Sequence, residues 1–142
     1  MSSPRDDFIK LLKTNGQSLT RARLGVFEAL LGQEPLSMQQ LANRVPKADR
    51  ASVYRAIELF ERLGIVQRLH TGWKYKLELT DKFATHHHHL TCLGCGRVLP
   101  MNEDALEQVI AKLAAAHHFT PSAHQIELQG YCQECAVPSL VS

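Results

Sequence analysis

The sequence predicts an α+β protein built of two parts, and two observations lead to this prediction. Apolar residues recur at helical spacing in the first part of the chain, and strand-like alternation follows them. Farther on, two Cys-x-x-Cys pairs enclose another helical pattern and another strand pattern. We therefore expect a winged helix-turn-helix domain at residues 1–80, a hinge linker at 81–85, and a small α+β domain with structural zinc at 86–142.

The first two expected helices are bounded by ordinary start and stop residues. Pro4 suits the first turn of a helix, and Asn15-Gly16 suits its end. Thr20 is a suitable N-cap for the second helix, which Gly32 should stop. Both segments carry apolar residues at helical spacing, so each is expected to pack one face against a core.

Two more helices follow. Ser37 and Gln40 have the spacing of a capping box, and Val45-Pro46 should end that short helix. Asp49 is a suitable N-cap for the fourth helix, and Gly64 should end it. The predicted buried face of the fourth helix is Val53, Ile57, Phe60 and Leu63.

A β-hairpin is expected after the fourth helix. Residues 65–69 form the first predicted strand, residues 70–72 the turn, and residues 73–79 the second strand. Alternation places four residues of the second strand on one face, namely Trp73, Tyr75, Leu77 and Leu79. This order of elements is that of a winged helix-turn-helix, in which the fourth helix would enter the major groove of DNA.

The outward face of the fourth helix carries groups that suit DNA. Arginine can hold a phosphate or a guanine edge, and Tyr and Ser can donate to phosphates. A solvated helix face would explain the same residues, and Arg21 and Arg23 on the second helix are equally compatible with either interpretation. The candidate DNA-binding residues are Arg21, Arg23, Arg50, Ser52, Tyr54 and Arg55.

Charge is distributed unevenly along the chain. The first 80 residues hold 13 Lys and Arg against 8 Asp and Glu, or +5, and the remainder holds 3 against 6, or −3. These values sum to the net charge of +2. A basic first part suits a polyanion such as DNA, although a mildly basic surface is also ordinary.

The second part is expected to fold around its cysteines. The histidine run 86–89 should lead a strand into the first Cys-x-x-Cys turn, and residues 123–130 should form another strand. Asn102 is the expected cap of the intervening helix. The residues predicted on the buried side of that helix are Leu106, Val109, Ile110 and Leu113.

All four cysteines of the chain belong to the two pairs, which are Cys92 with Cys95 and Cys132 with Cys135. Two such pairs can supply four thiolates in tetrahedral geometry, which is typical of a closed structural zinc site. A redox dithiol or free cysteines are the alternatives. Because the sequence shows neither a long apolar run nor a signal peptide, we expect a cytoplasmic protein without a membrane partner, where metal binding is favoured over disulfides.

The run His86-His87-His88-His89 indicates further metal sites. On a strand, alternate residues point to opposite faces, so His86 and His88 would face one way and His87 and His89 the other. Each pair could supply two ligands to a separate exchangeable metal. The candidates for completing these sites are Glu78, Asp81, Glu107 and His124.

The chain resembles the ferric uptake regulator family over about residues 8–136. The matching motifs are Thr20-Arg21-Ala22-Arg23 after Gly16, Ala51-Ser52-Val53-Tyr54-Arg55, Gly64-Ile65-Val66, the stretch from His86 to Gly96, and Gly130-Tyr131-Cys132-Gln133-Glu134-Cys135. The resemblance implies a homodimeric, metal-dependent transcriptional repressor that is not an enzyme, with residues 86–142 as its metal-binding dimerisation domain. It would bind a pseudo-palindromic double-stranded DNA operator and control metal-uptake genes.

The resemblance also assigns ligands to three sites. It implies structural Zn²⁺ on Cys92, Cys95, Cys132 and Cys135, a regulatory hinge site of Glu78, His87 and His89, and an additional site of His86, His88, Glu107 and His124. Family members often donate a histidine from the loop that here reads Gln33-Glu34-Pro35-Leu36, so the fourth hinge ligand is open between Asp81, Glu34, His70 and none. The sensed metal would be Fe²⁺ or Zn²⁺, with Mn²⁺ and Ni²⁺ as further candidates.

Three alternative functions are weighed beside this one. A peroxide-sensing regulator of the same family would use similar ligands. A zinc-dependent hydrolase is disfavoured because the chain has no His-Glu-x-x-His motif and no cysteine outside the two pairs. A metal-buffering protein would leave the winged-helix order unexplained.

Overall fold

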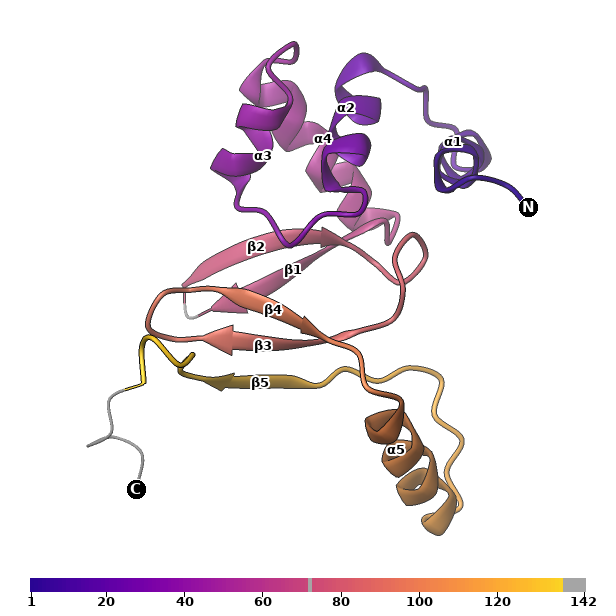
Figure 1. The fold of residues 1–142 in the computed structure, drawn as a ribbon. Helices are drawn as coiled ribbons and strands as arrows, with labels where there is room; N and C mark the ends of the chain where they lie inside the picture. The colour runs from indigo at the N-terminus through magenta and orange to yellow at the C-terminus, as the bar shows by residue number, and fades with distance from the viewer. Residues whose placement is uncertain (72, 137–142) are drawn as a thin grey trace. The chain divides into compact units, whose positions relative to one another are not determined.

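The computed structural model describes residues 1–71 and 73–136 and divides the chain into two compact units, Met1–Thr85 and His86–Ser142 (Figure 1). Four helices and a two-stranded hairpin make up the first unit. One helix and a three-stranded sheet make up the described part of the second. The predicted α+β class is confirmed.

The first unit starts with α1 (Pro4–Thr14), α2 (Arg21–Leu30), α3 (Met38–Arg44) and α4 (Arg50–Arg62). The predicted caps are confirmed: the side chains of Thr20, Ser37 and Asp49 each accept a hydrogen bond from the backbone N–H three residues later. Gln40 also accepts from the backbone N–H of Ser37, which completes the predicted capping box. Local hydrogen bonding therefore sets where these helices begin.

Aromatic rings fill the centre of the first unit. Phe8 of α1 stacks on Phe27 of α2 with ring centroids 4.2 Å apart, and it meets Phe60 of α4 edge-on at 5.3 Å. Val53 and Ile57 are buried beside them on the predicted face of α4. This packing orients the opposite face of α4, which carries Arg50, Tyr54 and Arg55, toward solvent.

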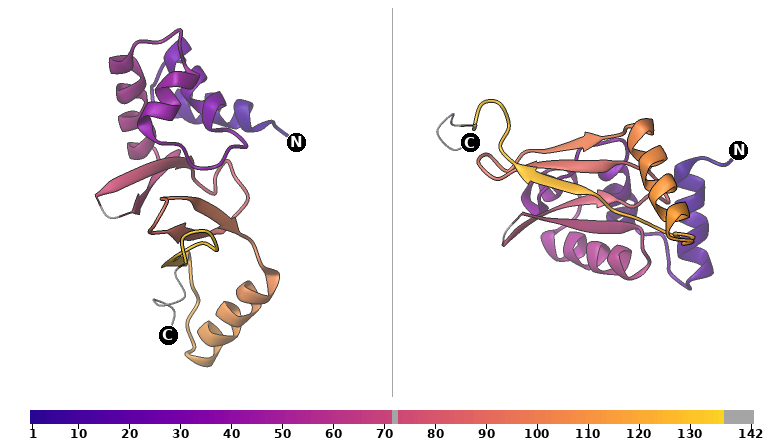
Figure 2. Two further views of the ribbon diagram at one scale, coloured as in Figure 1. Left: turned by 60° about the vertical axis from the view of Figure 1, so that its left-hand side comes forward. Right: turned by 90° about the horizontal axis from the view of Figure 1, so that it is seen from below.

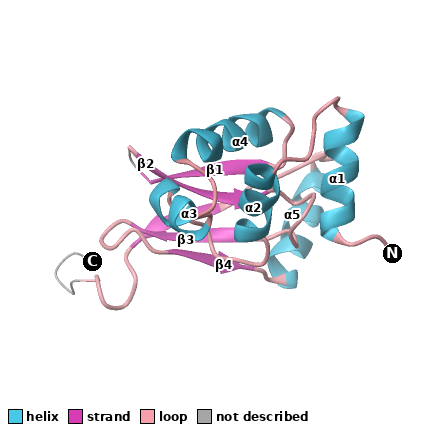
Figure 3. Cartoon of the chain, turned by 90° about the horizontal axis from the view of Figure 1, so that it is seen from above, coloured by secondary structure: helices cyan, strands magenta, loops and turns pink. Residues whose placement is uncertain are grey.

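The chain of the first unit continues into the antiparallel hairpin of β1 (Val66–Thr71) and β2 (Lys74–Leu79), seen with the helices in Figure 3. β1 runs to Thr71 rather than ending at the predicted residue 69, whereas β2 starts at Lys74 rather than at the predicted Trp73. Gly72, part of the predicted turn, lies outside the described residues. Leu36, before α3, forms a bridge with Leu77. The hairpin is thereby joined to the helix-turn-helix.

The segment expected to be a hinge linker, residues 81–85, packs on the first unit instead. The ring of Phe83 meets Phe27 edge-on at 5.2 Å, and Lys82 Nζ donates to the Leu63 carbonyl at 3.3 Å. Burial of an aromatic ring outweighs the freedom of a short polar loop. A loop-like composition therefore did not predict that this segment would be anchored.

The second unit contains a sheet ordered β4-β3-β5, formed by β3 (His88–Cys92), β4 (Val98–Met101) and β5 (Glu127–Gly130), which lie side by side in Figure 2. β3 pairs antiparallel with β4 and parallel with β5. The parallel pairing requires a crossover, which contains α5 (Asp104–Ala116). Two strands are shorter than predicted, because β3 starts at His88 rather than His86 and β5 starts at Glu127 rather than at residue 123.

Two expectations about α5 are wrong. Glu103, not Asn102, occupies the N-cap position, and it makes no side-chain capping hydrogen bond. No residue of α5 is buried: Val109 is 51% exposed and Leu113 58% exposed. Within the described residues, the hydrophobic core cluster lies in the first unit alone, and the apolar side of α5 is only partly covered, with Leu106 and Ile110 half-buried.

None of the described helices is both long enough and apolar enough to cross a membrane.

Candidate functional site

The four cysteines converge at one end of the sheet in the second unit. Cys92 and Cys95 lie where β3 ends, and Cys132 and Cys135 follow β5. Their Sγ atoms all lie within 4.8 Å of one another, and Cys95 and Cys132 are 4.0 Å apart. Four sulfurs at zinc-bonding distance in a tetrahedron are about 3.8 Å apart, so the donor set fits zinc with little rearrangement.

Backbone groups prepare this cluster for a cation. The backbone N–H groups of Cys132 and Cys95 donate to Cys92 Sγ, and these bonds lower the pKa of the Cys92 thiol to about 6. The neighbouring sulfurs, Cys132 first, raise the pKa of Cys135 to about 12. Without a cation, the Cys92 thiolate is favoured at neutral pH, whereas ionisation of all four cysteines together is not. Metal binding must therefore displace protons from the cluster.

A second cluster lies around Glu107 of α5. His88 Nε2 is 2.6 Å from Glu107 Oε1, His124 Nε2 is 2.9 Å from Oε2, and His86 Nε2 is 3.5 Å from Oε1. His86 Nε2 and His124 Nε2 are themselves 3.1 Å apart. Three imidazole nitrogens and one carboxylate thus point at a common centre, which is the donor set of an exchangeable divalent metal site.

The histidines also lower the pKa of Glu107, His88 first through its hydrogen bond and then His124. The carboxylate is thereby kept ionised, the form that a metal requires. His88 is buried, whereas Glu107 and His124 are half-buried. The cluster is therefore buried at His88 of β3 and accessible to solvent at Glu107 of α5.

The other two histidines of the run face each other, with the rings of His87 and His89 4.7 Å apart between centroids. The His86 and His88 rings make the matching pair at 4.8 Å. The predicted alternation is therefore present, although His86 and His87 precede the strand. Glu78, on β2 of the first unit, is buried and accepts a hydrogen bond from Gln67 Nε2 at 2.7 Å.

The three candidates for a fourth hinge ligand all belong to the first unit. Glu34, His70 and Asp81 are exposed there. Each is therefore accessible to a metal in the free chain, and the choice between them is open.

The candidate DNA-binding residues lie in the first unit. Arg21 and Arg23 of α2 line a pocket of about 410 Å³ together with Ser52 and Arg55 of α4. Arg55 donates to Ser52 Oγ at 3.1 Å, and Asp49, the N-cap of α4, lines the same pocket. Two helix N-termini and three guanidinium groups meet here, a combination that favours an anion such as a phosphate.

Lys47 is a further basic residue that the sequence interpretation missed. It lines the pocket formed by the starts of α2 and α4 and is exposed. Its position two residues before the cap Asp49 could have drawn attention to it. Arg50 and Tyr54 are exposed on α4, and Tyr54 is 46% accessible, as direct contact with a groove requires.

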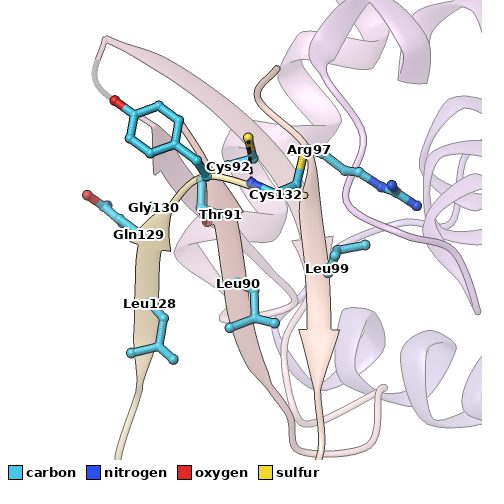
Figure 4. Close-up of a pocket in the computed structure, with 10 residues that line it drawn as sticks. Leu90, Thr91, Cys92, Arg97, Leu99, Leu128, Gln129, Gly130 and Cys132 are labelled. Carbon is cyan, nitrogen blue, oxygen red and sulfur yellow. Dashed lines mark hydrogen bonds between the residues drawn. The ribbon is translucent and has the colours of Figure 1, made fainter. Parts of the chain in front are cut away.

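An apolar row crosses the sheet of the second unit. Leu90 of β3 pairs in register with Leu99 of β4 and with Leu128 of β5, and Figure 4 shows these three side chains on neighbouring strands. They line a shallow pocket of about 220 Å³ that reaches Cys92 and Cys132. Leu128 is 53% exposed, so this row, like the apolar side of α5, lacks full cover.

The chain is similar to known proteins along most of its length. The model of the ferric uptake regulator family matches residues 2–129. The chain belongs to the ferric uptake regulator family. It is 36% identical over 132 residues to the ferric uptake regulation protein of Escherichia coli K12, covering 87% of this chain and 86% of that one.

Solved structures agree with the family. The Vibrio cholerae ferric uptake regulator has a TM-score of 0.69 and 31% identity, with 87% of this chain and 98% of that chain covered. The Helicobacter pylori regulator, described as having three functional metal binding sites, shares the fold at a TM-score of 0.79 and 20% identity, covering 93% and 91%. The chain is therefore a metal-responsive, DNA-binding transcriptional regulator with an N-terminal winged helix.

Proposed function

We propose that this member of the ferric uptake regulator family is a repressor of metal-uptake genes that binds a pseudo-palindromic operator as a homodimer when loaded with metal. The observation that carries the proposal is the presence, in one chain, of a four-cysteine cluster, a histidine and carboxylate cluster, and a basic helix-turn-helix. Tight and exchangeable metal sites in one protein suit a sensor.

The thiolate cluster is assigned to Zn²⁺ with an architectural role. Zinc would join the end of β3 to the end of β5 through Cys92, Cys95, Cys132 and Cys135. All four positions would be taken by sulfur, so no open position remains for water activation. The cluster of His86, His88, Glu107 and His124 is assigned to a second divalent metal, either Fe²⁺ or Zn²⁺, with Mn²⁺ and Ni²⁺ as further candidates.

The regulatory site is assigned to Glu78, His87 and His89. Glu78 belongs to the hairpin of the winged helix, and both histidines belong to the other unit. A metal held by these residues would fix the orientation of the DNA-binding unit relative to the second unit. The metal would thus increase the population of the arrangement that fits the operator.

A second copy of the chain is the proposed cover for the apolar surfaces of the second unit. Val109 and Leu113 on α5 are more than half exposed, and the row of Leu99, Leu90 and Leu128 is only partly covered. β5 is also an edge strand of its sheet. A symmetric dimer would bury these groups and set two recognition helices on one duplex, so the operator would be pseudo-palindromic.

On DNA, α4 is proposed to enter the major groove. Arg50, Tyr54 and Arg55 would reach base edges or phosphates, while Arg21, Arg23 and Ser52 would hold the backbone at the pocket between the helix starts. Lys47 would add one more phosphate contact.

The test is a metal-by-metal titration of DNA binding by the full-length protein. A duplex is first selected from a random-sequence pool, and its affinity is then measured with Fe(II), Mn(II), Zn(II) and Ni(II) against a chelator. We expect one metal to raise affinity at the lowest free concentration. If no metal changes affinity for any selected duplex, the proposal is wrong.

A further inference from the structure

Trp73, at the tip of the hairpin, is the most exposed large apolar side chain within the folded part of the first unit. It is the single tryptophan of the chain and is 87% exposed. It directly precedes β2, of which Leu79 and Leu77 are buried and Tyr75 is half-buried. The hairpin therefore carries an aromatic side chain outward, beyond the core that holds its base.

Side-chain contacts join the middle of the hairpin to α4. Arg68 of β1 makes a bidentate ion pair with Glu61 of α4, with N–O distances of 2.8 to 3.0 Å. The same guanidinium lies 4.3 Å from the centroid of the Tyr75 ring. The middle of the hairpin is thus tied to the recognition helix through Arg68.

The surroundings of Trp73 are cationic. Lys74 Nζ lies 5.2 Å from the centroid of the indole ring, and Lys76 lies farther along the hairpin. The charge of Arg68 is paired with that of Glu61. The only carboxylate on the described strands of the hairpin is Glu78, which is buried at the opposite end. An exposed indole among cations matches a surface that presents both apolar groups and negative charge.

We propose that Trp73 is a DNA-contacting residue, which packs its ring on the deoxyribose and phosphate backbone beside the half-site read by α4. The indole N–H can donate to a phosphate, its ring can cover apolar sugar atoms, and Lys74 can pair with the next phosphate. Deoxyribose and phosphate alternate along a duplex, so DNA offers both kinds of group at this spacing. The inference rests on the proposed DNA-binding function.

The first experiment uses the native indole as the probe. The metal-loaded full-length protein is titrated with a duplex selected from a random-sequence pool, and saturation is followed by anisotropy of a dye on the duplex. Acrylamide quenching of tryptophan fluorescence is measured with and without DNA. We expect the quenching constant to fall severalfold at saturation, because the exposed ring becomes covered.

The second experiment uses variants of the tip. Trp73→Ala should weaken binding about tenfold, the loss expected for a well-buried aromatic contact, whereas Trp73→Phe should retain most of the affinity. Lys74→Ala should reduce the slope of log affinity against log salt by about one phosphate contact, which Trp73→Ala should leave unchanged. Lys10→Ala, which removes an exposed charge from α1, is the matched control and should do neither.

The outcomes separate the inference from the function on which it rests. An indole that is quenched equally in free and saturated protein would overturn the inference, as would full affinity of Trp73→Ala. In either case, duplex selection would leave the proposed DNA-binding function standing. Failure to select any duplex would overturn both.

Discussion

The four-cysteine cluster should decide whether the second unit folds, and the Cys132→Ser variant tests this. Zinc would join Cys95 and Cys132, which are 37 positions apart. Closing a loop of this length stabilises a fold by about 4 kcal/mol in the chain-entropy relation derived for cross-links. The second unit has little other stabilisation from a hydrophobic core, since Val98 is its only buried aliphatic residue among those described. Burial of one such side chain is worth about 1.5–3 kcal/mol.

Loss of the metal cross-link therefore exceeds what this single buried side chain can offset. We expect the second unit of Cys132→Ser to unfold, while the first unit, with its own aromatic core, stays folded. Hydrogen exchange followed by mass spectrometry measures this directly. Peptides from β3 and β5 should lose protection, and peptides from α4 should keep it.

The matched control is Glu107→Gln, which removes a ligand from the histidine cluster and leaves all four sulfurs. It should retain at least one zinc per chain, that of the thiolate cluster, by elemental analysis and keep native protection in β3 and β5. If Cys132→Ser shows native protection in these strands, the architectural role assigned to the zinc is wrong.

Three further variants test other parts of the structure. Gly25→Ala would place a Cβ 2.9 Å from Val45 Cγ1. Overpacking of this kind costs about 1–3 kcal/mol, of which the better helix propensity of alanine offsets about 1 kcal/mol. The melting temperature of the first unit should therefore fall by a few degrees, and a rise would refute the close packing of α2 on this residue. Leu113→Glu should convert the dimer to a folded monomer in analytical ultracentrifugation, because a charge would enter the proposed interface; a stable dimer would argue against that face. Asp49→Ala should lower thermal stability, since it removes the α4 cap. The hydrogen bonds from Ser52 lower the pKa of Asp49 in the folded state. The loss of stability in Asp49→Ala should therefore be full above about pH 4 and disappear as the pH falls below the folded pKa. A loss of stability that grows in acid would contradict this assignment.

The helices of the first unit could be predicted because their boundaries depend on local chemistry. Thr20, Ser37 and Asp49 each satisfy a backbone N–H three residues ahead, and such bonds can be inferred from spacing alone. The grouping of the histidines was predictable for a similar reason, since alternation along an extended chain depends only on backbone geometry. The convergence of Arg21 and Ser52 on one pocket was not predictable, because it depends on how α2 packs beside α4.

The errors concern which residues bury an apolar surface. The sequence of one chain does not specify whether its own residues or those of a second copy do so. The stripe of Leu106, Val109, Ile110 and Leu113 has ordinary helical periodicity, and this pattern is the same whether the cover is the same chain or a second copy. Phe83 shows the reverse case, because an aromatic residue in a loop-like segment packs on Phe27 and anchors the segment. Trp73 was predicted in the second strand on the face of Leu77 and Leu79, yet it directly precedes β2 and is largely exposed, because alternation does not reveal where the hairpin extends past its core.

The central claim is that metal at Glu78, His87 and His89 controls operator binding. The most direct test is the affinity of the selected duplex by fluorescence anisotropy, with metal and with chelator, for the native chain and for a variant carrying His87→Ala and His89→Ala. A coupling of about 1–3 kcal/mol predicts that metal tightens native binding by about 5- to 150-fold. The double variant should show no metal response and still retain its thiolate zinc. Equal affinity of the native chain in metal and chelator, or an undiminished response in the double variant, would contradict the account.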